Sequence, residues 1–203
     1  MPKNYPDSYQ KAEKIFRENN GILRASEAVE LGIQLTILQR MLDDGILVKD
    51  ARGLYRLADI PLGNPDLIQV SILAPKSVIC LISALSFHNL TTQIPRRVYI
   101  ALPKSVTPPR IEYPPIDVVH LSTESYQAGI EEYILDGVTI RIYDKEKTIA
   151  DCFKFRNKIG LEVAIEALQD YFTLSDKNFS KLAEYSKIDR VKNVITPYIN
   201  AQR

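Results

Sequence analysis

The sequence predicts an α+β protein: a small helical module with a hairpin at the N-terminus, followed by a mixed α/β part that ends in helices. Two features of the hydrophobic pattern lead to this prediction. In residues 1–58, three segments with helical spacing precede two short segments with strand-like spacing. In the rest of the chain, one helical run at 76–89 precedes strand-like runs, and further helical runs follow these up to residue 199. Strands followed by helices are typical of the α+β class.

Three short helices, each followed by a glycine, are predicted in the N-terminal module. Their predicted ranges are 7–19, 27–31 and 34–44, and the glycines are Gly21, Gly32 and Gly45. Glycine is common at this position because it adopts the left-handed backbone conformation without strain. Ser26 is the expected N-cap of the second helix. The third helix is expected to turn one side inward, formed by Leu35, Leu38, Met41 and Leu42.

The residues after the third helix predict a hairpin. Residues 46–49 and 54–57 have strand-like composition, and residues 50–53 form a turn that contains a glycine. Helix, helix, turn, helix and hairpin is the element order of a winged helix-turn-helix, whose third helix enters the DNA major groove while the hairpin lies along the DNA backbone. Segment 58–66 is rich in Pro and Gly and is expected to be a linker. We therefore predict a DNA-binding domain in residues 1–58 and a second domain in residues 67–203.

Polar side chains on the third helix are candidates for reading DNA bases. Gln and Arg can pair bidentately with the edges of adenine and guanine. Cations before the second helix and in the hairpin are candidates for phosphate contacts. The predicted DNA-contacting residues are Arg24, Gln34, Thr36, Gln39, Arg40, Lys49, Arg52 and Arg56. The alternative is a solvated helix face on a subdomain that binds only protein.

The second domain is predicted to combine a sheet with helices. A helix is expected at 76–89, and strands are expected at 97–102 and 117–121, joined by a proline-rich loop. Segments 130–135 and 138–143 flank Asp136-Gly137, which favours a two-residue type I′ turn, so they should pair as an antiparallel hairpin. Further helices are expected at 145–155, 161–171, 178–185 and 190–199.

Composition and charge limit the class of protein. The chain has 203 residues, of which 45% are hydrophobic and 25% charged, with a net charge of +1, which excludes collagen-like and disordered chains. No apolar run approaches the roughly 20 residues of a membrane span, and the first residues do not form a signal peptide, so we expect a cytoplasmic protein. Cys80 and Cys152 stand among apolar neighbours and are expected to be buried thiols.

The end of the chain is basic and the middle is acidic. Residues 59–176 carry 11 basic and 15 acidic side chains, whereas residues 177–203 carry six and two. The basic end is a candidate surface for phosphate, RNA or an acidic protein. Its possible partner-binding residues are Lys177, Lys181, Lys187, Arg190 and Lys192. The alternative is an ordinary pair of amphipathic helices.

No pattern of catalytic residues or metal ligands is predicted. His88 and His120 lack the spacing of a metal site, so we expect structural histidines, no metal and no cofactor. Asp144, Glu146 and Asp151 could bind Mg²⁺ if they converged; an N-cap at Asp144 within a solvated charge patch is favoured. Nucleotide-binding and hydrolase motifs are missing. We expect no enzyme, with a divergent nuclease or nucleotidyltransferase as the alternative.

Several runs of residues resemble a known family. They are GILRAS (21–26), LDDGIL (42–47), RGLYRL (52–57), ALSFHNLT (84–91) and YDKEKTIADCFK (143–154). In this order and spacing they resemble the AbiEi antitoxin family of abortive-infection (AbiE, type IV) toxin-antitoxin systems. The resemblance covers nearly the whole chain, and the last two runs are its more specific part.

The resemblance implies an antitoxin that is also a transcriptional autorepressor. It implies that the N-terminal module binds inverted repeats in promoter DNA, with the helix at 34–44 reading bases and the hairpin bearing Lys49, Arg52 and Arg56 as the wing. It further implies that the C-terminal domain counteracts a nucleotidyltransferase toxin encoded beside it, with or without stable contact. Residues 1–58 carry nine basic and eight acidic side chains, so we expect weak or cooperative DNA binding. A protein-interaction module without DNA binding is the other alternative.

Overall fold

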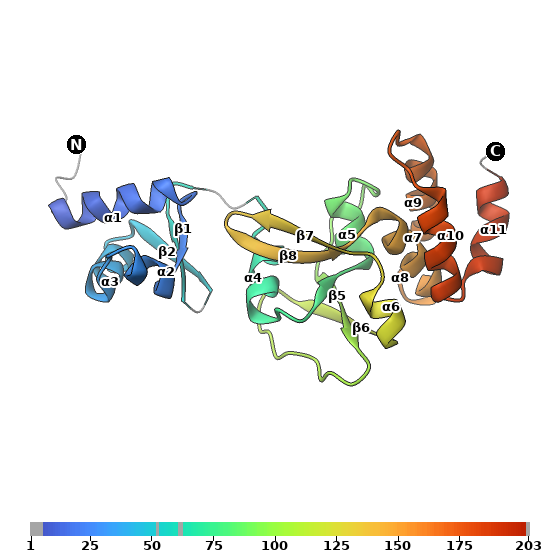
Figure 1. The fold of residues 1–203 in the computed structure, drawn as a ribbon, viewed down its shortest axis with the longest axis horizontal. Coiled ribbons are helices and arrows are strands. Elements are labelled where there is room, and N and C mark those ends of the chain that lie inside the picture. Colours follow the sequence, from blue (N-terminus) through green and yellow to red (C-terminus); the bar gives the residue numbers. More distant parts are fainter. Residues whose placement is uncertain (1–5, 52, 61–62, 202–203) are drawn as a thin grey trace. The chain divides into compact units, whose positions relative to one another are not determined.

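A computed structural model describes residues 6–51, 53–60 and 63–201. In these residues the chain is an α+β protein with 11 helices and eight strands in two sheets (Figure 1). The chain folds into two compact units. Unit 1 comprises Met1–Leu73 together with Ile134–Thr139, and unit 2 comprises Ala74–Tyr133 and Ile140–Arg203.

Unit 1 contains three helices, a three-stranded antiparallel sheet in the order β1-β3-β2, and a fourth helix. Its elements are α1 (Asp7–Glu18), β1 (Ile22–Arg24), α2 (Ala25–Glu30), α3 (Leu35–Asp43), β2 (Leu47–Ala51), β3 (Leu54–Leu57) and α4 (Pro65–Leu73). The three predicted helices and the predicted hairpin are confirmed as elements.

The core of unit 1 is formed by residues of α1, α3 and the sheet. Phe16, Leu38 and Met41 are at most 1% exposed and lie in one buried apolar cluster with Leu47 and Leu57. The turn after α1 also packs tightly: Gly21 has φ +77°, and a Cβ there would lie 2.0 Å from the Ile60 side chain. A glycine is therefore required here both by the backbone conformation and by the close approach of Ile60.

Three local features of unit 1 differ from the prediction. Residues 22–24 form strand β1, which pairs with β3 and was not predicted. Helix α2 starts at Ala25 rather than after Ser26, because the Glu27 carboxylate accepts a hydrogen bond (2.6 Å) from the backbone N–H of Arg24, which takes the N-cap position. Helix α4 starts inside the segment 58–66 for which a linker was predicted.

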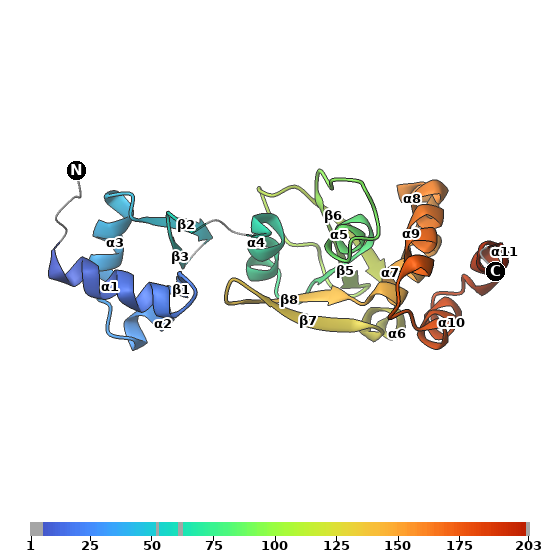
Figure 2. The same cartoon turned by 90° about the horizontal axis from the view of Figure 1, so that it is seen from above.

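The remaining elements combine a five-stranded mixed sheet with helices. They are β4 (Val78–Ile79), α5 (Leu81–Phe87), β5 (Val98–Pro103), β6 (Ile116–Leu121), α6 (Thr123–Gln127), β7 (Ile130–Leu135), β8 (Val138–Tyr143), α7 (Lys145–Lys154), α8 (Arg156–Ile159), α9 (Leu161–Thr173), α10 (Phe179–Ile188) and α11 (Lys192–Asn200). The strand order is β6-β5-β4-β8-β7. Figure 2 shows α7 to α11 gathered beside this sheet.

The hairpin of β7 and β8 matches its prediction to the residue. Asp136 (φ 48°) and Gly137 (φ 76°) both adopt the left-handed conformation that a type I′ turn requires. The predicted strands at 97–102 and 117–121 are also confirmed, as β5 and β6, and they pair in parallel.

The predicted helix at 76–89 is wrong in its first half. Val78 and Ile79 form β4, which pairs with β5 and also with β8. Only residues 81–87 are helical. A short apolar run fits a buried strand as well as a buried helix. Residues 78–79 form a strand because β5 and β8 offer hydrogen-bonding edges on both sides.

Among the helices of the described residues, none has the length and apolar character needed to span a membrane.

Candidate functional site

Helix α3 presents its polar side chains to solvent. Leu38 and Met41 anchor the opposite side of the helix in the core of unit 1. The exposed polar residues predicted to read DNA are Gln34, Thr36, Gln39 and Arg40. The structure therefore brings Thr36, Gln39 and Arg40 together on one open helix face, because residues on the same side of a helix recur every three to four positions. Gln34 is exposed at the N-cap of α3, beside Ile37 and residues of α1.

Leu35 lies on this open face, contrary to the prediction that it packs inward with the other leucines. Its side chain is 60% exposed. The inward positions are instead Leu38 and Met41, with Ile37 packed beside them. Spacing by three and four places from Met41 leads to Leu38 and Ile37, which leaves Leu35 on the outside.

One hydrogen bond orders the open face of α3. Gln39 donates from Nε2 to Oδ1 of Asp43 over 2.9 Å, one helical turn further on. Arg40 is exposed and has no ion pair with another described residue. The face therefore offers an oriented amide and a free guanidinium.

The predicted phosphate-contacting cations differ in their surroundings. Arg24, at the start of α2, and Lys49, in β2, are exposed. Arg56 is half-buried and donates from its guanidinium to the backbone carbonyls of Leu57 and Ile60. Arg52 lies outside the described residues. Arg24 and Lys49 thus remain available for a ligand, whereas Arg56 holds the end of the hairpin.

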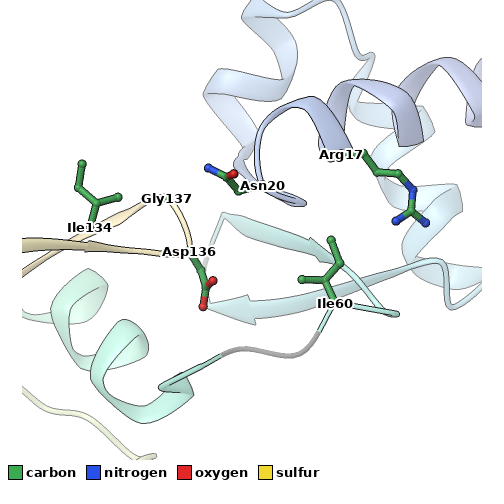
Figure 3. Close-up of a pocket in the computed structure, with 6 residues that line it drawn as sticks. All are labelled: Arg17, Asn20, Ile60, Ile134, Asp136 and Gly137. Carbon is green, nitrogen blue, oxygen red and sulfur yellow. The ribbon is translucent and has the colours of Figure 1, made fainter. Parts of the chain in front are cut away.

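A shallow hollow in unit 1 has no set of reactive groups. It is lined by Arg17, Asn20, Ile60, Ile134, Asp136 and Gly137 (Figure 3). The guanidinium of Arg17 is held by the carboxylates of Glu13 and Asp59 at 2.7 Å each. We assign no site to this hollow.

In unit 2 the predicted partner-binding cations fall into two groups. Lys181 forms an ion pair with Asp144 (3.1 Å), and Lys177 donates to the backbone carbonyl of Leu174. Lys187, Arg190 and Lys192 are exposed around the turn between α10 and α11. Only this second group offers cations for a partner.

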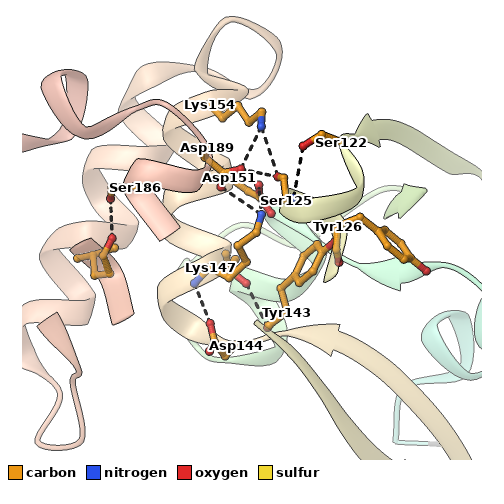
Figure 4. Close-up of polar contacts among 12 residues, drawn as sticks. Ser122, Ser125, Tyr126, Tyr143, Asp144, Lys147, Asp151, Lys154, Ser186 and Asp189 are labelled. Carbon is orange, nitrogen blue, oxygen red and sulfur yellow. Dashed lines mark hydrogen bonds and ion pairs between the residues drawn. The ribbon is translucent and has the colours of Figure 1, made fainter. Parts of the chain in front are cut away.

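Unit 2 contains a largely buried cluster of two lysines, two aspartates and a serine that we name the charge cluster (Figure 4). Its members are Ser125 of α6, Lys147, Asp151 and Lys154 of α7, and Asp189 at the end of α10. Lys147 donates to Asp151 over 2.5 Å and to Asp189 over 3.1 Å. Asp189 also accepts from Ser125 (2.5 Å) and Lys154 (3.0 Å). The cluster therefore ties three separate helical segments together.

The charges of the cluster control each other's protonation. Burial acts to lower the pKa of Lys147, but the adjacent carboxylates of Asp151 and Asp189 outweigh it and the pKa is raised. Burial acts to raise the pKa of Asp189, but Lys147, Ser125 and Lys154 together lower it. The ammonium of Lys147 also lies 4.6 Å from the centroid of the Tyr143 ring, a cation–π contact. Lys147 is thus a charged lysine held inside the protein.

Asp151 is the member of the charge cluster whose negative charge is least stabilised by its surroundings. Burial raises its pKa to about 7, only partly opposed by Lys147, and its Oδ2 atom has no hydrogen-bond partner among the described residues. The unfolded chain would ionise this carboxyl near pH 4. Between pH 4 and 7 the folded state therefore binds a proton that the unfolded state has released.

The Asp151→Asn variant tests this difference. Its side chain cannot ionise, so the wild type should lose stability relative to Asp151→Asn as the pH rises from about 4 to about 7, with a plateau above. Urea unfolding of both proteins at several pH values measures the difference. A difference in free energy of unfolding that stays constant over this range would contradict the raised pKa.

The three acidic residues considered for Mg²⁺ each have separate protein partners. Asp144 is the N-cap of α7, as predicted, and accepts from the Lys147 backbone N–H over 2.8 Å. Glu146 accepts from the hydroxyl of Tyr171 over 2.7 Å. All three are at most 5% exposed, so the predicted solvated patch is wrong. No group of three or more His, Cys, Asp or Glu side chains within the described ranges is arranged to hold a metal ion.

The histidines and cysteines have the structural surroundings that were predicted. His88 donates from Nε2 to the backbone carbonyl of Tyr143 over 2.8 Å, and burial lowers its pKa. His120 donates to the carbonyl of Val106 over 3.1 Å. Cys80 and Cys152 are free and fully buried.

Comparison with known proteins bears on the fold. No protein-family model matches the chain, and no curated protein matches it in sequence. Among solved structures, the chain is similar to the crystal structure of the RV2827C protein from Mycobacterium tuberculosis, with a TM-score of 0.60 and 14% sequence identity. The match covers 98% of this chain and 83% of that chain. At this identity the likeness concerns the fold alone.

The charge cluster was missed at the level of sequence. Lys147 and Asp151 are four residues apart on a segment whose other positions include Ile149 and Phe153. Half of the residues of α7 are charged, which is typical of an exposed amphipathic helix, so the sequence of this segment does not signal a buried ion pair. Asp189 has no local signal, since it lies 42 residues from Lys147.

Proposed function

We propose that this chain is a DNA-binding antitoxin and transcriptional autorepressor of a type IV, AbiE-like toxin-antitoxin operon. Residues 7–57 act as a winged helix-turn-helix, with α3 as the recognition helix and the β2–β3 hairpin as the wing. The chain has no catalytic role in this proposal. Its ligand is duplex promoter DNA.

The open face of α3 is the observation that carries the proposal. A recognition helix needs one side held by its own domain and the other free to enter the major groove. Leu38 and Met41 supply the first, and the exposed Gln39 and Arg40 supply the second. Amide and guanidinium groups are the side chains that pair bidentately with adenine and guanine.

The cations around α3 support phosphate contacts on a modest scale. Arg24 and Lys49 are exposed and Arg56 is bound to backbone carbonyls. Few phosphate contacts per monomer mean a shallow salt dependence and weak binding by one copy. We therefore propose that two copies bind the two halves of an inverted repeat.

The antitoxin role is supported by the resemblance of residues 84–91 and 143–154 to the AbiEi family. In this part of the proposal, unit 2 counteracts a nucleotidyltransferase toxin. The exposed cations Lys187, Arg190 and Lys192 are its candidate contact residues.

Arg40→Ala should weaken binding to operator DNA by about 1–3 kcal/mol if Arg40 pairs with a guanine. The measurement is fluorescence anisotropy of the full-length chain with the duplex that lies upstream of its own gene, at several salt concentrations. Lys187→Ala is the matched control, because it also removes one exposed cation but lies in unit 2. Equal affinity of wild type and Arg40→Ala, or no binding to duplex DNA, would reject the proposed function.

A further inference from the structure

Leu35 is an apolar side chain on the otherwise polar open face of α3. It lies in the first turn of the helix and is 60% exposed. Its neighbours in sequence, Gln34 and Thr36, and Gln39 one helical turn further on are all exposed. A large exposed leucine on a helix that binds DNA has one natural partner in the major groove, the C5-methyl group of thymine.

Gln39 lies one helical turn beyond Leu35, on the same side of the helix. One N–H of its amide is used in the hydrogen bond to Asp43. The side chain retains its second N–H and its carbonyl oxygen. One donor and one acceptor are what the N7 and N6 positions of adenine require in the major groove. The hydrogen bond to Asp43 therefore orients Gln39 without removing its capacity to pair with adenine.

We propose that Leu35 and Gln39 together read a step of A·T base pairs, in which Leu35 contacts a thymine methyl and Gln39 pairs with an adenine. Asp43 is a positioning residue that orients the Gln39 amide. Four residues of helix span about 6 Å, and base pairs are spaced by about 3.4 Å. The two side chains thus reach base pairs that are adjacent or one apart. This inference rests on the proposed DNA binding and specifies the sequence that is bound.

The surroundings of Leu35 favour DNA over a second copy of the chain as its partner. A protein surface that covered Leu35 would also bury the exposed amide of Gln39, which lies one helical turn further on the same side. Burying such groups without hydrogen-bond partners costs free energy. Base edges present donors and acceptors beside each thymine methyl, so they satisfy the polar groups and the leucine together.

Base analogues test each contact separately. The full-length chain first selects its preferred duplex from a random-sequence pool. Each thymine of that duplex is then replaced by uracil, which removes only the C5-methyl, and each adenine by 7-deazaadenine, which removes only the N7 acceptor. We expect one uracil to weaken wild-type binding about fourfold, the effect of one methyl group. We expect one 7-deazaadenine to weaken it by at least about fivefold.

Variants of the chain assign the losses to side chains. Leu35→Ala should bind the thymine and uracil duplexes equally, and Gln39→Ala should no longer distinguish adenine from 7-deazaadenine. Asp43→Asn keeps an acceptor oxygen and should retain this distinction, whereas Asp43→Ala should reduce it. Leu73→Ala is the matched control, because Leu73 is 41% exposed on α4, and it should behave as the wild type.

Each other outcome overturns the inference in a recognisable way. If a duplex is selected but uracil and 7-deazaadenine have no effect at any position, DNA binding stands and the A·T reading is wrong. If the pool yields no duplex that the chain retains, both the inference and the proposed function fail. If Leu35→Ala changes only the oligomeric state in sedimentation, Leu35 contacts a second copy.

Discussion

Replacing Lys147 with methionine is expected to destabilise the protein by about 3–5 kcal/mol. Lys147 is fully buried and is the ion-pair partner of two buried carboxylates, Asp151 and Asp189. Methionine has a similar length and fills the space, but it leaves the negative charge of the cluster without its central cation. Removing one partner of a buried ion pair costs more than the pair contributes, since the other charge stays buried.

Urea unfolding of wild type and Lys147→Met at pH 7 measures this loss. Lys145→Met is the control on the same helix, because Lys145 pairs with the exposed carboxylate of Asp176. That change should cost no more than about 1 kcal/mol. The double variant Lys147→Met/Asp151→Leu removes the unpaired carboxyl as well and should regain part of the lost stability. A Lys147→Met protein as stable as the wild type would show that the charge cluster does not hold α7.

Replacing Phe16 with alanine is expected to destabilise unit 1 by about 3–5 kcal/mol. The Phe16 ring is 0% exposed and packs in the same cluster as Leu38 and Met41 of α3. The cavity left by the ring cannot be filled by small movements of a closely packed core. Because α3 is held by this core, Phe16→Ala should also weaken the proposed DNA binding, although the buried Phe16 ring cannot itself contact DNA.

Hydrogen exchange resolved along the chain is the measurement for Phe16→Ala, and it should rise in α1 and α3. Phe179→Ala makes the same chemical change at a ring that is 45% exposed on α10. It should cost about 1–2 kcal/mol, from its partial burial and its contact with Phe172 at 5.2 Å between ring centroids. Unchanged exchange in α1 and α3 would contradict the role of Phe16.

Elements with local signals could be predicted from the sequence. The hairpin of β7 and β8 follows from Asp136-Gly137, because few other dipeptides adopt two consecutive left-handed conformations at low cost. Helices α1, α2 and α3 were predicted from their periodicity and from the glycines that follow them. In each case the physical cause lies within a few residues of its effect.

Elements that depend on distant partners could not be predicted in this way. Val78 and Ile79 are strand because β5 and β8 supply hydrogen-bonding edges on both sides. Residues 22–24 are strand because β3, formed by residues 54–57 much later in the chain, lies beside them. The apolar composition of these segments suits either secondary structure.

The candidate site on α3 also combines features that depend on local sequence with one that depends on distant partners. The polar residues of α3 follow from spacing, and their exposure agrees with the prediction. The position of Leu35 does not follow, because a helix with leucines at several angles can turn more than one side inward. The packing of Leu38 and Met41 against Phe16 selects the orientation.

By itself, the sequence determined which segments of this protein form its hairpins and most of its helices, and which side chains on α3 are polar. The tertiary structure alone decided that Leu35 faces solvent and that Lys147, Asp151 and Asp189 meet in one buried cluster. Helix period and turn conformation depend on neighbouring residues and can be seen in the order of amino acids. The protonation and burial of an ion pair depend on the other segments around it, and Asp189 reaches Lys147 only once α10 has packed against α7.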